Sequence, residues 1–184
     1  GGKTIVKDFV QKVRPEKGIP AVLRYETKPG VQAQVDWGEL GTIEVDGKLK
    51  KLFCFNMILG YSRMRYVEFT LNIDTSTLIQ CHLNAFEYFG GFTQEILYDN
   101  MKTAFICDAD GVFKPNKKLL LFANHYGFLP RRCQIRRPQT KGKVERFIDY
   151  LLKNFIPQIS FASSNIDELN EKVIFWIKEI SEKT

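Results

Sequence analysis

The chain is poor in the residues that build zinc centres, and it has no long apolar stretch. Its 184 residues include only two histidines and four cysteines, and no two cysteines form a C-x-x-C pair. A structural zinc site is therefore unexpected, because such sites take four Cys or His ligands at short spacings. No apolar run approaches the ~20 residues of a membrane-spanning helix. With no signal peptide visible either, we predict a protein of the reducing cytoplasm that does not associate with membranes.

The remaining composition is typical of a folded domain with a basic surface. Hydrophobic residues make up 44% of the chain and aromatic residues 13%, which favours a packed interior over disorder. Lysine and arginine number 27 against 21 acids, so the formal net charge is +6. A positive surface of this kind favours a nucleic-acid partner.

The densest run of positive charge covers residues 131–146, RRCQIRRPQTKGKVER. One acid, Glu145, stands inside it and would repel a phosphate backbone unless a divalent cation reversed the local charge. This points to carboxylates elsewhere in the chain, and two lie in strand-like settings: Asp36 in QVDWGE and Asp99 in ILYDNMK. The cations of the run are Arg131, Arg132, Arg136, Arg137, Lys141, Lys143 and Arg146.

The first half of the chain predicts an extension followed by three antiparallel strands. Residues 1–30 contain three prolines and are interpreted as an N-terminal extension, ahead of a core over residues 31–184. The alternation in VQAQVDW predicts a strand with Asp36 on its polar face. Asp46-Gly47 predicts a hairpin turn. The apolar stretches 51–59 and 64–71 complete the meander.

The second half alternates between helices and short strands. A helix is expected from the cap at Asp74 or Thr75 to Gly90, and the strand EILYD follows it. Residues 100–116 predict only a turn or mobile loop. The expected order then continues with a helix over 117–126, a short strand within 128–135, a helix over 144–155 and a last helix over 166–180. Glu145 falls beside the apolar stripe of its helix, so its carboxylate can face a cleft next to the sheet.

Three motifs in this order resemble the catalytic core of DDE transposases and retroviral-type integrases, most closely the IstA-type transposases of bacterial insertion sequences. They are QAQVDWGE at 32–39, YDNMKTA at 98–104 and KGKVER at 141–146, with 45 residues between Asp99 and Glu145. Each motif alone is weak, and the three in order are specific. The resemblance implies an α/β, ribonuclease H-like fold: a mixed five-stranded sheet, three antiparallel strands then two parallel, flanked by helices.

The same resemblance implies a metal-dependent active site. Asp36, Asp99 and Glu145 would be the catalytic residues and would together hold two Mg²⁺ or Mn²⁺ ions. Hard cations of this kind prefer oxygen ligands, which agrees with three carboxylates. The implied chemistry is hydrolysis of a phosphodiester at the element's end, followed by transfer of the freed 3′-hydroxyl into target DNA.

Other residues are assigned by type and position. Two interpretations of Trp37 stay open: it packs against DNA, or it is an aromatic of the core or its rim. Glu39 should face away from Asp36 if the strand stays regular, and Asp108 is interpreted as a loop residue. His82 is interpreted as structural. The candidate DNA contacts are Asn100, Lys102, Arg136, Arg137, Lys141, Lys143 and Arg146.

The resemblance also implies partners. These are the DNA of the element ends and target, further copies of the same protein in a dimer or larger multimer, and an AAA+ ATPase. An upstream helix-turn-helix region would belong to a longer protein. Two alternatives remain open from the residues themselves: a DNA-binding module that does not cut, and a ribonuclease acting on RNA–DNA hybrids. A purely oligomerising domain leaves the basic run unexplained.

Overall fold

The fold is seen in a computed structural model that describes residues 27–99, 101–133, 145–159 and 165–182. The side chains of Glu145 and Arg146 fall outside this description, as does most of the expected N-terminal extension. The boundary at residue 30 therefore stays a prediction. No helix in the described ranges is both long and apolar enough to cross a membrane.

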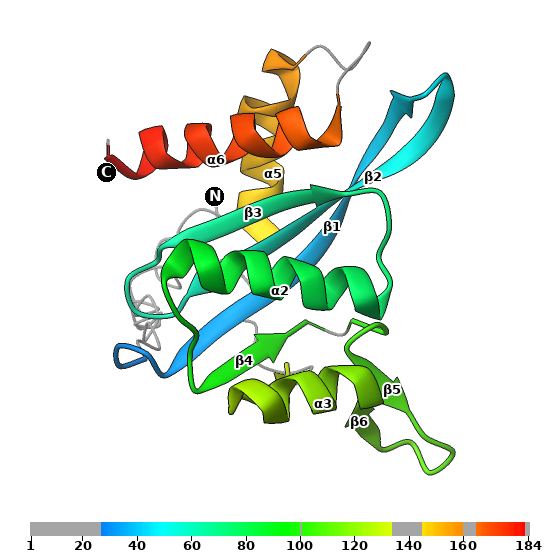
Figure 1. Cartoon of the computed structure of the whole chain (residues 1–184), viewed down its shortest axis with the longest axis vertical. Coiled ribbons are helices and arrows are strands. Elements are labelled where there is room, and N and C mark those ends of the chain that lie inside the picture. The colour runs from blue at the N-terminus through cyan, green and yellow to red at the C-terminus, as the bar shows by residue number, and fades with distance from the viewer. Residues whose placement is uncertain (1–26, 100, 134–144, 160–164, 183–184) are drawn as a thin grey trace, which may run out of the picture.

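A mixed five-stranded sheet forms the centre of the domain (Figure 1). Its strands lie in the order β3-β2-β1-β4-β7. The first three pair antiparallel, whereas β4 runs parallel to β1 and β7 runs parallel to β4, which confirms the predicted sheet. The strands are β1 (Gln32–Val45), β2 (Lys48–Leu59), β3 (Arg65–Thr70), β4 (Glu95–Tyr98) and β7 (Leu129–Arg132).

The turn between β1 and β2 follows directly from its two residues. Val45 pairs with Lys48, so the loop contains only Asp46 and Gly47. Both have positive φ, 54° and 71°, as the tight primed turns of hairpins require. Aspartate and glycine adopt this conformation more readily than other residues do, which is why the dipeptide predicted the hairpin.

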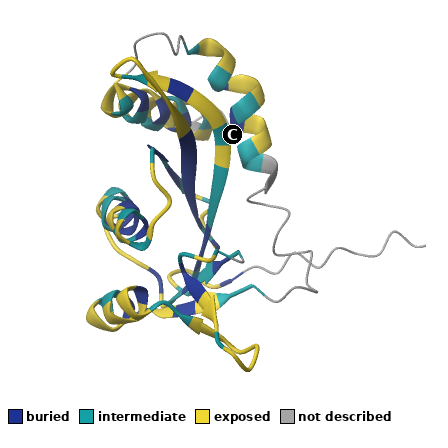
Figure 2. Ribbon diagram, turned by 90° about the vertical axis from the view of Figure 1, so that its right-hand side faces the viewer, coloured by how far each residue is buried: buried dark blue, intermediate teal, exposed yellow. Residues whose placement is uncertain are grey.

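Helices α2 (Thr75–Phe89) and α3 (Lys117–Tyr126) cover one face of the sheet (Figures 1 and 2). Asp74 caps α2, because its side chain accepts hydrogen bonds from the backbone N–H groups of Ser76 and Thr77. Both helices end at a glycine in the left-handed conformation. The core under them contains Ala33, Val35, Phe55, Met57, Leu78, Ile96, Leu119 and Ala123.

The opposite face carries α5 (Glu145–Asn154), and α6 (Ile166–Glu182) packs against β3. Asn170 of α6 accepts from the backbone N–H of Phe69 and donates to its carbonyl oxygen, at 2.6 and 3.1 Å. This satisfies backbone groups of an edge strand that would otherwise be open. A short 3-10 helix, η1 (Ile156–Gln158), follows α5. The core here contains Ile43, Leu52, Cys54, Val67, Phe69, Leu151, Phe155, Leu169, Val173 and Ile177.

One expectation was wrong. Residues 100–116 were predicted as a turn or loop, but they contain a hairpin of β5 (Phe105–Cys107) and β6 (Phe113–Pro115). Each strand is too short to show an alternating pattern. Asp108 closes the turn, since its carboxylate accepts from the N–H groups of Asp110 and Val112 and pairs with Lys114 at 2.8 Å. The hydrogen bond from Lys114 and those from the backbone lower the pKa of Asp108.

Candidate active site

Asp36 and Asp99 lie side by side on neighbouring parallel strands. Val35 of β1 is in register with Tyr98 of β4, so the next residues along the two strands are Asp36 and Asp99. The backbone N–H of Asp99 donates to the carbonyl oxygen of Val35 at 3.4 Å. Residues in register on adjacent strands point to the same face, about 4.8 Å apart. The two carboxylates therefore share one face at the carboxyl end of β4, where open α/β sheets bind their ligands.

The alternation of β1 determines which face this is. Ala33 and Val35 are buried under α2, so Asp36 faces the other side, where α5 lies. The backbone N–H of Trp37 donates to the Asp36 carboxylate at 2.9 Å and holds one of its oxygens. Asp36 is half-buried and Asp99 likewise.

Trp37 is a half-buried aromatic that packs against the core. Its ring packs edge-on against Phe55, with 6.0 Å between the centroids, and its Nε1–H donates to Thr70 Oγ1 at 3.2 Å. These contacts lie on the α2 side, away from Asp36. Of the two interpretations left open by the sequence, the structure supports packing. Glu39 is exposed and pairs with Lys51, as expected for a residue that is not a ligand.

Helix α5 brings its first residue, Glu145, to the face that carries Asp36. Ile148, one turn after Glu145, packs against Gly38, two residues after Asp36. A Cβ atom at position 38 would lie only 2.6 Å from Ile148 Cδ1, so the helix approaches β1 at a residue that has no side chain. The first turn of α5 therefore lies on the side of the sheet that carries Gly38 and Asp36. The direction of the Glu145 side chain lies outside the described residues.

The candidate DNA contacts are only partly visible. Lys102 is exposed in the turn that follows Asp99, three residues from the carboxylate. Arg146 belongs to α5, but its side chain is not described. The others lie outside the described residues: Asn100, Arg136, Arg137, Lys141 and Lys143.

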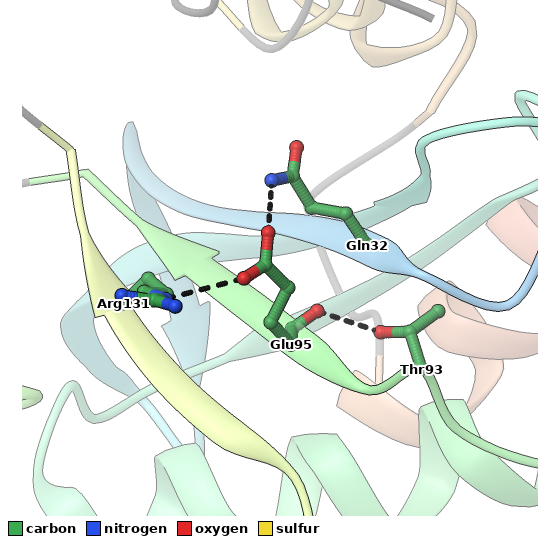
Figure 3. Close-up of polar contacts among 4 residues, drawn as sticks. All are labelled: Gln32, Thr93, Glu95 and Arg131. Carbon is green, nitrogen blue, oxygen red and sulfur yellow. Dashed lines mark hydrogen bonds and ion pairs between the residues drawn. The ribbon is translucent and has the colours of Figure 1, made fainter. Parts of the chain in front are cut away.

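Two cations of the basic run have partners inside the domain, which the sequence did not indicate. Arg131 donates to Glu95 at 3.2 Å, and the other Glu95 oxygen accepts from Gln32 at 2.6 Å (Figure 3). Arg132 stacks on Phe113 of the β5–β6 hairpin, 3.3 Å from the ring centroid. Both interactions depend on residues distant in the chain.

Two further residues near Asp36 were missed. Asn56 lies directly across from Asp36 on β2, and Arg65 of β3 donates to the Asn56 side chain at 3.0 Å. Burial raises the pKa of the Cys54 thiol on the same face, the Asp36 charge raises it further, and the Arg65 guanidinium opposes both. The signal available in the sequence was one polar residue, Asn56, inside the apolar strand KLFCFNMIL.

The donor set fits a hard divalent cation. Asp36 and Asp99 offer carboxylate oxygens on one face, the ligand type that Mg²⁺ and Mn²⁺ prefer. Among the side chains that the structure describes, no group of three His, Cys, Asp or Glu residues gathers at one point. A third carboxylate from Glu145 would complete the set.

The sequence matches an integrase family and transposases of bacterial insertion sequences. The Integrase core domain family matches residues 26–138, which include Asp36 and Asp99. The chain is 43% identical, over its full length, to a putative transposase for insertion sequence element IS5376 from Geobacillus stearothermophilus, and covers 45% of it. It is 36% identical, over its full length, to the transposase for IS21 from Pseudomonas aeruginosa, and covers 46% of that protein. The chain thus spans about half the length of these relatives.

A solved structure supports the predicted fold. The HTLV-2 integrase catalytic core domain, determined in complex with magnesium, superposes with a TM-score of 0.51 at 16% sequence identity. The match covers 78% of this chain and 83% of that one. At this identity the likeness bears on the fold alone, and it confirms the ribonuclease H-like architecture of the integrase cores.

Proposed function

The chain belongs to the Integrase core domain family, and from this premise we infer that it is the catalytic core of a DNA transposase that cuts element ends and joins them to target DNA. The observation that carries this proposal is that Asp36 and Asp99 directly follow the paired residues Val35 and Tyr98 of two parallel strands. Helix α5, which begins at Glu145, packs beside Gly38 of the same strand as Asp36. Asp36, Asp99 and Glu145 are proposed as the catalytic carboxylates. The similarity to insertion-sequence transposases extends over the whole of this chain, and it favours DNA over an RNA–DNA hybrid as the substrate.

Asp36, Asp99 and Glu145 would hold Mg²⁺ or Mn²⁺. When bound, two such ions activate the attacking oxygen and stabilise the leaving oxygen of an in-line displacement at phosphorus. The residues of the chain orient this chemistry. The Trp37 N–H orients one Asp36 oxygen. The hydrogen bond from the Asp99 N–H to the Val35 carbonyl oxygen sets the position of Asp99 along the strand direction relative to β1.

Cations beside the carboxylates would bind the DNA backbone. Lys102 is exposed three residues after Asp99, and we propose that it contacts a phosphate. We propose the same role for Asn100, Arg136, Arg137, Lys141, Lys143 and Arg146. A phosphate bound there would bring the scissile bond to the carboxylate edge.

The proposed partners follow from the family. They are element-end and target DNA, further copies of the transposase that bridge two DNA ends, and an AAA+ ATPase such as IS21-type elements would require. A cytoplasmic location fits these partners. The whole transposase would supply end recognition from residues beyond this core.

The test is substitution of each proposed carboxylate in the longest protein that contains this chain. Asp36→Asn, Asp99→Asn and Glu145→Gln should each abolish DNA cleavage and strand transfer while circular dichroism and DNA affinity stay near wild type. Glu39→Gln is the matched control, because Glu39 is exposed and paired with Lys51. Wild-type turnover in any of the three variants would refute the assignment. Metal-independent, salt-sensitive DNA binding without any cleavage would favour the non-cutting module instead.

A further inference from the structure

The face that carries Asp36 contains a buried polar pair that the proposed chemistry does not use. Asn56 is fully buried, and its Oδ1 accepts from Arg65 Nη1 at 3.0 Å. Its Nδ2 has no hydrogen-bond partner among the described residues. A buried amide in this state is costly, so its presence among the apolar residues at the centre of β2 calls for a role.

The strand register places this pair beside Asp36. Asn56 is the cross-strand neighbour of Asp36, and opposed residues of antiparallel strands have Cβ atoms about 5 Å apart on one face. The neighbours Cys54 and Val67 on this face pack into the core under α5. The unpartnered Asn56 amide therefore lies on the Asp36 side of the sheet, where a carboxylate is the nearest acceptor type that the register provides.

Arg65 connects Asn56 to α5. Its guanidinium carbon lies 3.8 Å from the centre of the Phe147 ring, two residues after Glu145. Burial lowers the pKa of Arg65 to about 10, so the group remains a cation at neutral pH. A guanidinium can donate in its plane to Asn56 while its face stacks on a ring, which the compact ammonium of lysine cannot do.

We propose that Arg65 is a positioning residue for the metal site, because it ties Asn56, the cross-strand neighbour of Asp36, to Phe147 near the start of α5. Together with the Gly38–Ile148 contact, it fixes the separation of β1 from the first turn of α5 at a second point. The inference rests on the proposed function, since it concerns the distance between the Asp36 and Glu145 ligands.

The test measures Mn²⁺ affinity of the chain by calorimetry, well below the melting temperature of every variant. Arg65→Met should weaken Mn²⁺ binding about tenfold, the usual effect of losing a group that orients a ligand. The direction of the change in Mn²⁺ affinity is informative. If charge alone mattered, removing a cation near the site would tighten the binding of Mn²⁺. Arg131→Met is the matched control, because it removes one arginine from the same face of the sheet. The Mn²⁺ affinity of this variant should stay near wild type.

Two milder variants protect the test against a folding defect. Arg65→Lys keeps the charge and loses the stacking fork, and Phe147→Leu keeps an apolar side chain and loses the ring. Each should weaken Mn²⁺ binding several-fold, and Phe147→Leu should add little in an Arg65→Met background because both remove one contact.

The outcomes separate the two levels of the proposal. A lower melting temperature with unchanged Mn²⁺ affinity in all three variants would show that Arg65 only stabilises the fold, and would overturn the inference. If the wild-type chain itself shows no Mn²⁺ binding that Asp99→Asn removes, with or without DNA, the proposed function fails and this inference fails with it.

Discussion

A Cβ atom at Gly38 would lie 2.6 Å from Cδ1 of Ile148, closer than any real side chain permits. Gly38 follows Asp36 by two residues, and Ile148 follows Glu145 by three. The absence of a side chain at one position of β1 therefore decides how close the first turn of α5 comes to the proposed metal ligands. The contact between α5 and β1 is apolar, and it lies next to the proposed polar site.

Substitution of this glycine should impair catalysis more than folding. Gly38→Ala should push α5 outward and reduce strand transfer by about tenfold to a hundredfold, since a shift of ~1 Å at a reacting centre has effects of that size. Adding Ile148→Val, which removes the clashing Cδ1, should restore most of the activity. Strand-transfer assays on the full protein measure both effects.

The control is Gly91→Ala, because nothing lies within 4 Å of a Cβ at that position. It should leave strand transfer unchanged. A Gly38→Ala enzyme as active as wild type would show that the α5 contact does not set the ligand geometry.

Metal should bind at the carboxyl end of β4. In crystals soaked with Mn²⁺ we expect anomalous density between Asp36 and Asp99, and its loss in Asp99→Asn crystals. Chelation of the metal should abolish cleavage and leave DNA binding largely intact, because the basic residues provide that binding. Anomalous density elsewhere in the domain, with none at this edge, would contradict the assignment.

Lys141 and Lys143, in the basic run that follows β7, should contribute to the salt dependence of DNA binding. Replacing Lys141 and Lys143 by alanine should weaken binding and reduce the slope of log K against log salt by about 2, about one per lost phosphate contact. Lys48 and Lys50, at the far tip of the β1–β2 hairpin, are the matched control pair. An equal loss of slope in the control pair would indicate diffuse attraction only.

His82 should make the domain less stable in acid. Its Nδ1 donates to the Leu78 carbonyl at 2.7 Å, and its Nε2 accepts from the Tyr98 hydroxyl at 2.9 Å. Burial lowers the pKa of His82 from 6.5 to about 4. Between these values the unfolded chain binds a proton that the folded chain does not, so stability is full above pH 6.5 and falls by roughly 3 kcal/mol toward pH 4.

Chemical denaturation at neutral pH and at about pH 4.5 measures this difference. His82→Gln keeps an acceptor for Tyr98 and should lose much of the acid sensitivity. His125→Gln, which alters an exposed histidine of α3, should keep the wild-type response. Identical pH dependence in all three proteins would mean that other groups dominate.

Local patterns were enough for much of the fold. Asp46-Gly47 predicted its turn because few residue pairs adopt two positive φ values, and the alternation in VQAQVDW predicted which face of β1 carries Asp36. The strands of the β5–β6 hairpin were missed because strands of three residues carry no period, although a turn or loop was expected at the residues between them, where Asp108 accepts its hydrogen bonds.

The sequence by itself determined the identities and order of the three carboxylates, the strands and helices that carry them, and the basic character of the chain, since these depend on residue type and short-range spacing. Only the tertiary structure decided that Asp36 and Asp99 follow the paired residues Val35 and Tyr98, that Arg131 and Arg132 contact residues of the domain, and that Arg65 stacks on Phe147. Each of these is a contact between segments far apart in the chain. Such contacts are fixed by how strands pair and helices pack, and no local pattern encodes them.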